Sequence, residues 1–554
     1  MEGRQPRLWL RTDPFTSGAL QVAPHPKLNL HYLKKIGTYA QSKGKSGFPK
    51  LSYSVWRHIA CHKLSLTENL AELYFQGFQL LNSDVAEERR KGQEQLSAVQ
   101  DEKEKELVLS RTSVDTLQFL LYLFIQQVHK VSLRSSLVAG QEWPLRPRSP
   151  DLDGRAVSPS SGSPSKGLDE SNHLSFILSH LSDILTLLAE SDAYSSSATD
   201  LYLSTEAVTA LGLLIEGTVA KDRNVQSLIA IAKIQTVQAS SGFSKITQAF
   251  SFRLFETWIR NCLVNSPFGV AACISAGQRL NWPTTGGDME SGKRGKIASN
   301  ASKAPKSHTL VFISQVCKQT LAKSSNTLTN SRVRIHRCRS SYLYLLSPMK
   351  SVNVDKCRNS TIVLGPVETT VHLHSCEQVT LIAVAGRVSI SSSTLCTLHV
   401  LTPLRPLILG GNDTIILAPY HTHYPQLETH MASVGLTASS NLWDKPLPVG
   451  PDHQEELPVF SLLPLEEFSM FSIPFEMEGP TTSTPGGLPH AYAEALSTRQ
   501  SNMKKWQAMV RDSGLDKEQR KQFQELVETK FQIWLGESNN SRQLDDLAAG
   551  STFK

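Results

Sequence analysis

The sequence predicts a multidomain protein in which α-helical regions precede a parallel β-helix and a C-terminal helix follows it. Three observations support this fold class. The chain has 554 residues, which is too long for a single hydrophobic core. Its first half places apolar residues at helical spacing. Its second half repeats one stretch of alternating polar and apolar residues, each copy followed by a Cys or a Ser.

An N-terminal helical region is predicted for residues 1–140. It contains a highly charged stretch, which we expect on a solvated helix face, and then the apolar run Leu117–Val128. Residues 141–170 form a predicted linker, because their prolines, serines and glycines bury too little surface to fold. Three Ser-Pro pairs in this linker have two interpretations. Their serines are sites of phosphorylation by proline-directed kinases, or the pairs arose by sequence drift in a linker without regulation. The serines are Ser149, Ser158 and Ser163.

A second helical domain is predicted over 171–282. Asn172 is the expected N-cap of its first helix, because leucines at helical spacing begin at Leu174. Residues 283–307 form a basic linker. Its lysines contact an acidic surface, act as a nuclear signal, or serve solubility alone.

Composition excludes several classes of protein. The net charge of +7 is modest for this length, and no basic face is interleaved with aromatic residues, so we expect no nucleic-acid partner. The first residues lack the apolar core of a signal peptide, and the longest apolar run is far too short for a transmembrane segment. Eight cysteines fit reduced thiols. We therefore expect a protein of the cytoplasm.

The repeats begin at Arg332, Ser351, Thr370 and Arg387, which are 19, 19 and 17 residues apart. Period-2 alternation directs the apolar residues to one side of each strand. A single strand of this kind cannot bury its apolar face, so successive turns must stack as a parallel β-helix. The predicted inward residues are Val333, Ile335, Val352, Val354, Val371, Leu373, Val388 and Ile390.

A ladder of small residues, one per turn, follows the strands at Cys338, Cys357, Cys376 and Ser393. Their spacing stacks them in a row rather than around a tetrahedral metal ion. We therefore interpret them as buried corner residues. The outward positions form two polar stripes where function could lie: Arg332, Ser351, Thr370 and Arg387 in one, and His336, Asp355, His374 and Ser391 in the other.

The C-terminal part divides into an irregular proline-rich segment, 441–490, and a helical tail, 491–554. Asp516 and Gln519 predict a capping box at the start of a helix in this tail. Its apolar face, which includes Phe523 and Trp534, either packs on the same protein, as we expect, or meets a partner helix.

The turns from Val311 to Leu436 resemble the cofactor C-like (C-CAP) domain, which we place at 308–440. The resemblance rests on the repeats, on "GPV" at Gly365, and on "HYPQLETHMASVGL" from His423. Members include tubulin-binding cofactor C, the X-linked retinitis pigmentosa protein and cyclase-associated proteins. The resemblance implies a right-handed β-helix and a cytoskeletal role with microtubules. It also implies residence at the centrosome, the spindle pole or the basal body.

Family members that activate GTP hydrolysis present an arginine on an outward strand position, in a pattern like Gln-x-Arg. The resemblance aligns Arg387 with that arginine, although Ala385 replaces the glutamine. An arginine finger raises the rate of hydrolysis by about 10³ to 10⁵. Alternatively, Arg387 is a solvated charge, since Gly386 loosens the strand that would hold it. Arg387 is the single catalytic candidate.

No cofactor-binding or metal-binding residue is predicted. His421, His423 and His430 lack a thiol or carboxylate at ligand spacing. The chain has no G-x-x-x-x-G-K-[ST] loop, so any GTPase chemistry would occur in trans on a partner.

Two functions follow as expectations. The first is a non-enzymatic scaffold that binds tubulin or centrosomal proteins at the centrosome and microtubule organising centre. It would act in centrosome and organelle positioning and in cell shape. The alternative is a GTPase-activating factor for tubulin or an Arf-like small G protein, with Arg387 as its arginine finger.

Overall fold

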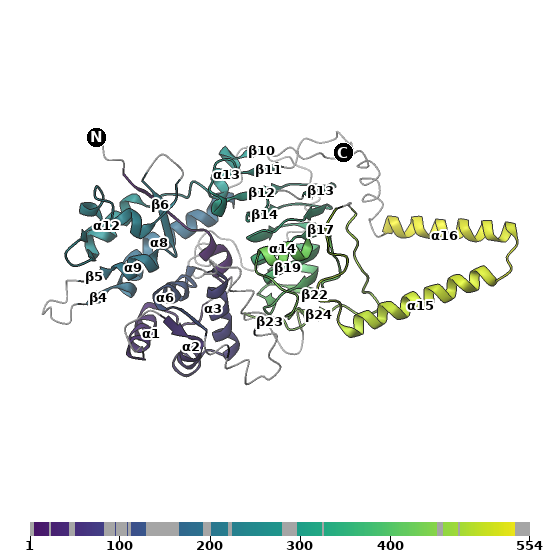
Figure 1. Ribbon diagram of the computed structural model, residues 1–554, viewed down its shortest axis with the longest axis horizontal. Helices are drawn as coiled ribbons and strands as arrows, with labels where there is room; N and C mark the ends of the chain where they lie inside the picture. Colours follow the sequence, from purple (N-terminus) through teal and green to yellow (C-terminus); the bar gives the residue numbers. More distant parts are fainter. Residues whose placement is uncertain are drawn as a thin grey trace, which may run out of the picture.

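Figure 1 shows three parts side by side: a helical domain, a stack of β-strands, and a long pair of C-terminal helices that projects from the stack. The computed structural model describes residues 5–20, 24–43, 50–81, 95, 108, 112–128, 165–191, 201–219, 224–279, 296–323, 326–450, 458–474 and 477–537. No helix in these residues is both long and apolar enough to cross a membrane.

The helical domain is built around short helices with small sheets between them. Its helices are α1 (Leu30–Lys43), α2 (Tyr53–His58), α3 (Glu68–Leu81), α6 (Thr116–Ile125), α8 (Ser165–Leu188), α9 (Thr205–Leu211), α10 (Leu228–Ala232), α11 (Gln238–Ser241), α12 (Phe252–Cys262) and α13 (Val270–Ala276), with single π-helical turns at η1 (Pro14–Gly18) and η2 (Ile59–Lys63). Its strands are β1 (Arg7–Leu10), β2 (Lys50–Ser52), β3 (Ser113–Asp115), β4 (Glu190–Ser191), β5 (Leu201–Ser204), β6 (Ile215–Thr218), β7 (Gln226–Ser227), β8 (Phe243–Ser244) and β9 (Ala249–Ser251).

One hydrophobic core unites the helical domain. It runs from Leu8 in β1 to Leu263 after α12 and includes all of the apolar run in α6. Strand β1 pairs with β6, more than two hundred residues further along the chain. The two helical regions that the sequence separates, 1–140 and 171–282, therefore form one domain.

The end of the first predicted linker is helical. Helix α8 begins at Ser165, inside 141–170, and Asn172 lies within this helix instead of capping it. The prediction of an N-cap at Asn172 is wrong, because the helix continues about two turns further back, to Ser165. Ser149, Ser158 and Ser163 lie outside the described residues.

The predicted parallel β-helix is confirmed, with two long sheets. One, which we call the junction sheet, contains β10 (Gln278–Arg279), β11 (Lys296–Ser299), β12 (Leu310–Ser314), β14 (Arg332–His336), β16 (Ser351–Asp355), β18 (Val367–His374), the second half of β19 (Glu377–Ser391), β21 (Leu407–Ile408) and β23 (Leu447–Pro448). The other, the far sheet, contains β13 (Thr320–Lys323), β15 (Tyr342–Leu345), β17 (Arg358–Leu364), the first half of β19, β20 (Thr394–Leu401), β22 (Asp413–Pro419) and β24 (Phe460–Leu462).

The register follows the sequence repeats. Val333 pairs with Val352, Val352 with Val371, and Val371 with Val388, and these side chains form the buried interior. The structure adds an earlier turn at β12, which pairs in parallel with β14. Part of the predicted basic linker 283–307 is also regular structure, because β11 pairs antiparallel with β12 and η3 (Lys306–His308) precedes β12.

The small-residue ladder turns the chain between the two sheets. Cys338, Cys357, Cys376 and Ser393 are all buried, which confirms their interpretation as corner residues. The residue before each one has a positive φ, for example Arg337 at 54° and Lys356 at 55°. This left-handed conformation makes the sharp bend while it keeps the small side chain directed inward.

The outer side of the far sheet is covered by the end of the β-helix. Tyr344, Val363 and Ile382 point outward there and pack against Tyr424 and Met431 around α14 (Leu427–Ser433). The proline-rich segment 441–490 also contributes to the core, since Trp443 and Phe468 are buried against the β-helix interior.

The tail forms two helices, α15 (His490–Asp512) and α16 (Lys517–Glu537), and the Asp516–Gln519 capping box is present with both reciprocal hydrogen bonds. The expectation that the α16 apolar face packs on the same protein is wrong for most of its residues. Leu526, Phe531 and Trp534 are each about half exposed. The first half of α15 is anchored, through Tyr492 against Phe468 and through a hydrogen bond from Arg499 to the Phe468 carbonyl, and Leu535 near the end of α16 is buried.

Candidate functional site

Arg387 lies on the outward side of the junction sheet, beside the inward Val388. Only 4% of its surface is exposed, because the helical domain lies directly over this part of β19. Its Nη2 donates a hydrogen bond of 3.3 Å to Oε1 of Gln76 in α3. A Cβ at Gly77 would clash with the Tyr122 hydroxyl and lie 3.2 Å from Arg387 Nη1, so glycine permits the close approach of α3.

The charge of Arg387 is balanced only indirectly. Nε2 of Gln76 donates to Glu72 at 2.7 Å, so Gln76 connects the carboxylate to the guanidinium. Burial lowers the pKa of Arg387 to about 10, and the acidic groups of Tyr122 and Glu72 oppose that shift. Nε of Arg387 and the Tyr122 hydroxyl have no hydrogen-bond partner among the described residues.

A small cavity of about 20 Å³ lies between η1 and the junction sheet, lined by polar groups of Ser17, Thr370, Arg387 and Ser389. Its size suits a single water molecule. Arg387 therefore faces a small gap between the two domains.

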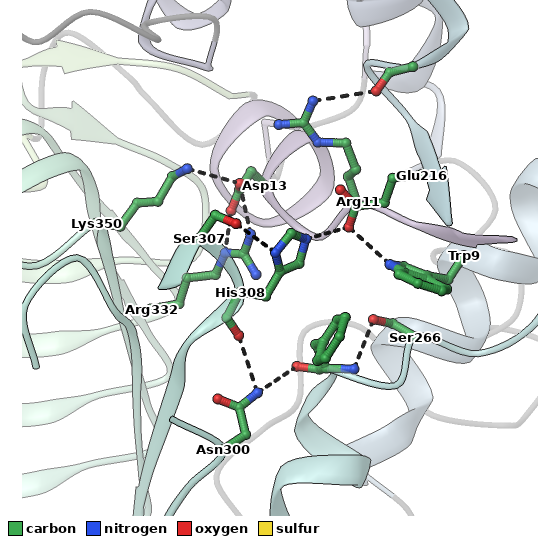
Figure 2. Close-up of polar contacts among 12 residues, drawn as sticks. Trp9, Arg11, Asp13, Glu216, Ser266, Asn300, Ser307, His308, Arg332 and Lys350 are labelled. Atoms are coloured by element: carbon green, nitrogen blue, oxygen red, sulfur yellow. Dashed lines mark hydrogen bonds and ion pairs between the residues drawn. The ribbon is translucent and has the colours of Figure 1, made fainter. Parts of the chain in front are cut away.

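A buried ion pair fixes the helical domain on the same stripe. Asp13 accepts two hydrogen bonds from Arg332, of 2.6 and 3.0 Å, and Lys350 lies 3.6 Å from it. Burial alone would raise the pKa of Asp13, but Arg332 and Lys350 hold it far below its usual range. Figure 2 shows this bidentate pair with Lys350 beside it.

A second polar contact joins the two domains at the first turn. His308 of η3 lies 2.5 Å from Glu216 of β6, and Trp9 also donates to this carboxylate at 2.9 Å. Figure 2 places the His308 ring between Ser307 and Glu216. Burial would raise the pKa of Glu216, but His308 lowers it. Together with Arg405, which donates to Asn69 of α3 at 3.0 Å, these contacts span the height of the junction sheet.

The predicted outward stripes are in register but are not solvent-exposed. Arg332, Ser351, Thr370 and Arg387 are all buried, as are His336, Asp355 and Ser391. The alternative in which Arg387 is a solvated charge is therefore wrong. For Arg332 and Arg387 the reason is the helical domain, whose Asp13 and Gln76 contact them.

The three histidines of the closing segment do not converge. His421 stacks on His399 with ring centroids 3.7 Å apart, and His430 makes a hydrogen bond of 2.8 Å with the Tyr424 hydroxyl. The part of the chain that the structure describes contains no group of three or more His, Cys, Asp or Glu residues placed to hold a metal ion.

Sequence reasoning missed the groups that surround Arg387. Glu72, Gln76 and Tyr122 come from helices whose sequence shows only ordinary amphipathic or apolar patterns. No local signal marks them, since their role depends on docking against a strand more than 260 residues further along the chain.

The β-helix belongs to a known class. A family model described as tubulin binding cofactor C matches residues 330–449. These residues include the strands β14 to β23 and the buried Arg387. The observed β-helix begins one turn earlier, at β12.

Relatives extend the similarity to the whole chain. TBCC domain-containing protein 1 from Homo sapiens is 50% identical over 559 residues, which cover 98% of each chain. The protein of the same name from Xenopus laevis is 45% identical and covers 99% of this chain and 100% of its own. The one from Danio rerio is 43% identical, with 98% and 93% covered. The chain therefore belongs to the TBCC domain-containing protein 1 family.

Proposed function

We propose that this chain is a non-enzymatic cytoskeletal scaffold that binds tubulin or centrosomal proteins. In this proposal it acts at the centrosome, the spindle pole and the microtubule organising centre, in centrosome and organelle positioning and in cell shape. The names of the family model and of the relatives support a link to tubulin. The division into a β-helix, a docked helical domain and a projecting helical pair supports a role in joining partners.

The observation that carries the non-enzymatic part is the burial of Arg387. An arginine finger must reach the transferring phosphate of a bound nucleotide and must be held there by its neighbours. Arg387 is 4% exposed, and the hydrogen bond to Gln76 directs it into the domain junction. The GTPase-activating alternative requires the helical domain to leave the junction sheet, which would expose the buried Asp13–Arg332 pair as well.

The proposal is tested by expressing the fluorescent full-length chain in cells and by capturing tubulin with the purified chain. Wild type and Arg387→Ala should both concentrate at the centrosome and capture the same amount of tubulin or of centrosomal proteins. A chain that stays diffuse and captures neither would overturn the scaffold. Capture that depends on Arg387 and on bound GTP would favour the activator.

A further inference from the structure

The corners of the β-helix carry an uneven distribution of charge. Each corner has the same backbone: a left-handed residue, an inward small residue, an outward residue and a second left-handed residue. Arg337, Lys356, Ser375 and Ser392 occupy the first of these positions in successive turns, with φ between 49° and 55°. Arg339, Arg358, Glu377 and Thr394 occupy the outward position, in register through β-bridges and strand pairs.

The first turns of this corner are basic. We define the basic corner as five exposed residues: Lys318, Arg337, Arg339, Lys356 and Arg358. Lys318 belongs to the turn before Arg339, since its N–H donates to the Arg339 carbonyl at 3.0 Å. The equivalent positions of later turns hold Ser, Thr and Glu, so the corner geometry does not require a cation. The presence of basic residues in the first turns is therefore not explained by the requirements of the fold.

Most of these cations have no internal counter-charge. Arg358 pairs with Glu377 at 3.1 Å across an exposed surface. The other four make no ion pair with a described residue. Neighbouring turns stack about 4.8 Å apart, so the corner gathers positive charge on a short stretch of surface. An acidic ligand would balance this concentration of charge.

The geometry points to the basic corner as a docking site for an acidic peptide segment of a partner protein. The site is narrow: it follows one edge of the stack for three turns, about 10 Å, and then meets Glu377. A broad polyanion would reach beyond it to Glu377 in the next turn, and no aromatic residue within it offers a stacking platform for bases. An extended or helical acidic segment matches its width.

This assignment rests on the proposed scaffold function and names the chemistry of one partner. The test variant replaces four cations with the residues found in later turns: Arg337→Ser, Arg339→Thr, Lys356→Ser and Arg358→Thr. Because the same backbone already accepts Ser and Thr at these positions, the variant should fold with an unchanged melting temperature. The matched control removes four exposed cations from the C-terminal helices: Lys504→Ser, Lys505→Ser, Arg511→Ser and Lys517→Ser.

The measurement is fluorescence anisotropy of labelled (Glu)10 titrated with the full chain at 50 and 200 mM NaCl. Wild type and the control should bind (Glu)10 and not (Gln)10, more weakly at the higher salt concentration, and the corner variant should bind at least tenfold more weakly. Equal binding by the corner variant, or no binding by wild type, would overturn the assignment. So would tighter, corner-dependent binding of duplex DNA or of vesicles containing phosphatidylserine. Centrosomal localisation is measured separately, so a failure here leaves the scaffold proposal standing.

Discussion

His399 and His421 show how strongly burial changes the pKa of single residues in this protein. Their rings stack 3.7 Å apart, both lie near Phe468, and His421 also lies near Phe471. Burial lowers the pKa of His399 to about 4 and, with the nearby His399 ring, lowers that of His421 to about 2. Both rings are therefore neutral in the folded protein at pH 7 and act as aromatic packing groups.

The free energy of unfolding should consequently decrease as the pH is lowered below 6.5, the ordinary pKa of histidine. Between that pH and the depressed folded-state values, the unfolded chain binds protons that the folded chain excludes, so unfolding becomes more favourable as pH falls. Each histidine contributes about 1.4 kcal/mol per pH unit in this window. His421→Phe should keep the packing and remove the contribution of His421 to the slope, leaving that of His399, as measured by urea denaturation from pH 7 to pH 5. An unchanged slope would contradict the account.

At the scale of the elements, the β-helix could be predicted from the sequence and its surroundings could not. Inward residues such as Val352 and Leu373 alternate with polar ones, and that period is visible without a structure. Strand β12 lies within the predicted domain but not among the four repeats, because all five of its residues are buried, with Phe312 covered by α13, so no alternation appears. The burial of Arg387 depends on Gln76, 311 residues away, and no local pattern encodes such a contact.

Leu373 tests the stacking of the turns. Leu373→Asp places an unpaired carboxylate in the interior between Val354 and Ile390, so we expect loss of the cooperative unfolding transition. Leu373→Met conserves volume and should cost less than about 1.5 kcal/mol. Circular dichroism during urea titration measures both. A cooperative, stable Leu373→Asp variant would show that this position does not face the core.

Substitutions on the exposed faces of α15 and α16 should be tolerated, in contrast to substitutions in the β-helix interior. Trp534→Gln should change the free energy of unfolding by no more than about 0.5 kcal/mol, because Trp534 is 52% exposed. The control, Phe468→Ala, removes a fully buried ring and should cost about 3–5 kcal/mol. Thermal unfolding compares the two. A large loss from Trp534→Gln would mean that α16 packs on its own chain in solution.

At the scale of the whole molecule, the buried ion pair Asp13–Arg332 joins residues 319 positions apart and ties the helical domain to the β-helix. Apolar contacts add to this pair and to the other polar contacts of the junction, since Leu407 and Leu409 of the β-helix belong to the same hydrophobic core as the helices. The two domains should therefore unfold together and not as independent units.

Removing one partner or both partners of this pair should distinguish the free-energy cost of an unpaired buried charge from the net contribution of the pair to stability. Asp13→Ala leaves Arg332 buried without its counter-charge and should destabilise the protein by about 3–5 kcal/mol, while Asp13→Leu combined with Arg332→Met should recover most of that loss. Urea denaturation of both variants gives the comparison. Equal losses in the single and double variants would mean that the pair itself stabilises the junction.

The central claim is that Arg387 is held inside the domain junction and serves no catalytic role. Single-turnover GTP hydrolysis by tubulin and by Arf-like small G proteins tests it most directly, with and without an excess of the purified full chain. We predict no stimulation by wild type or by Arg387→Ala, with partner capture intact in both. Stimulation by wild type that disappears in Arg387→Ala would contradict the claim and establish a GTPase activator.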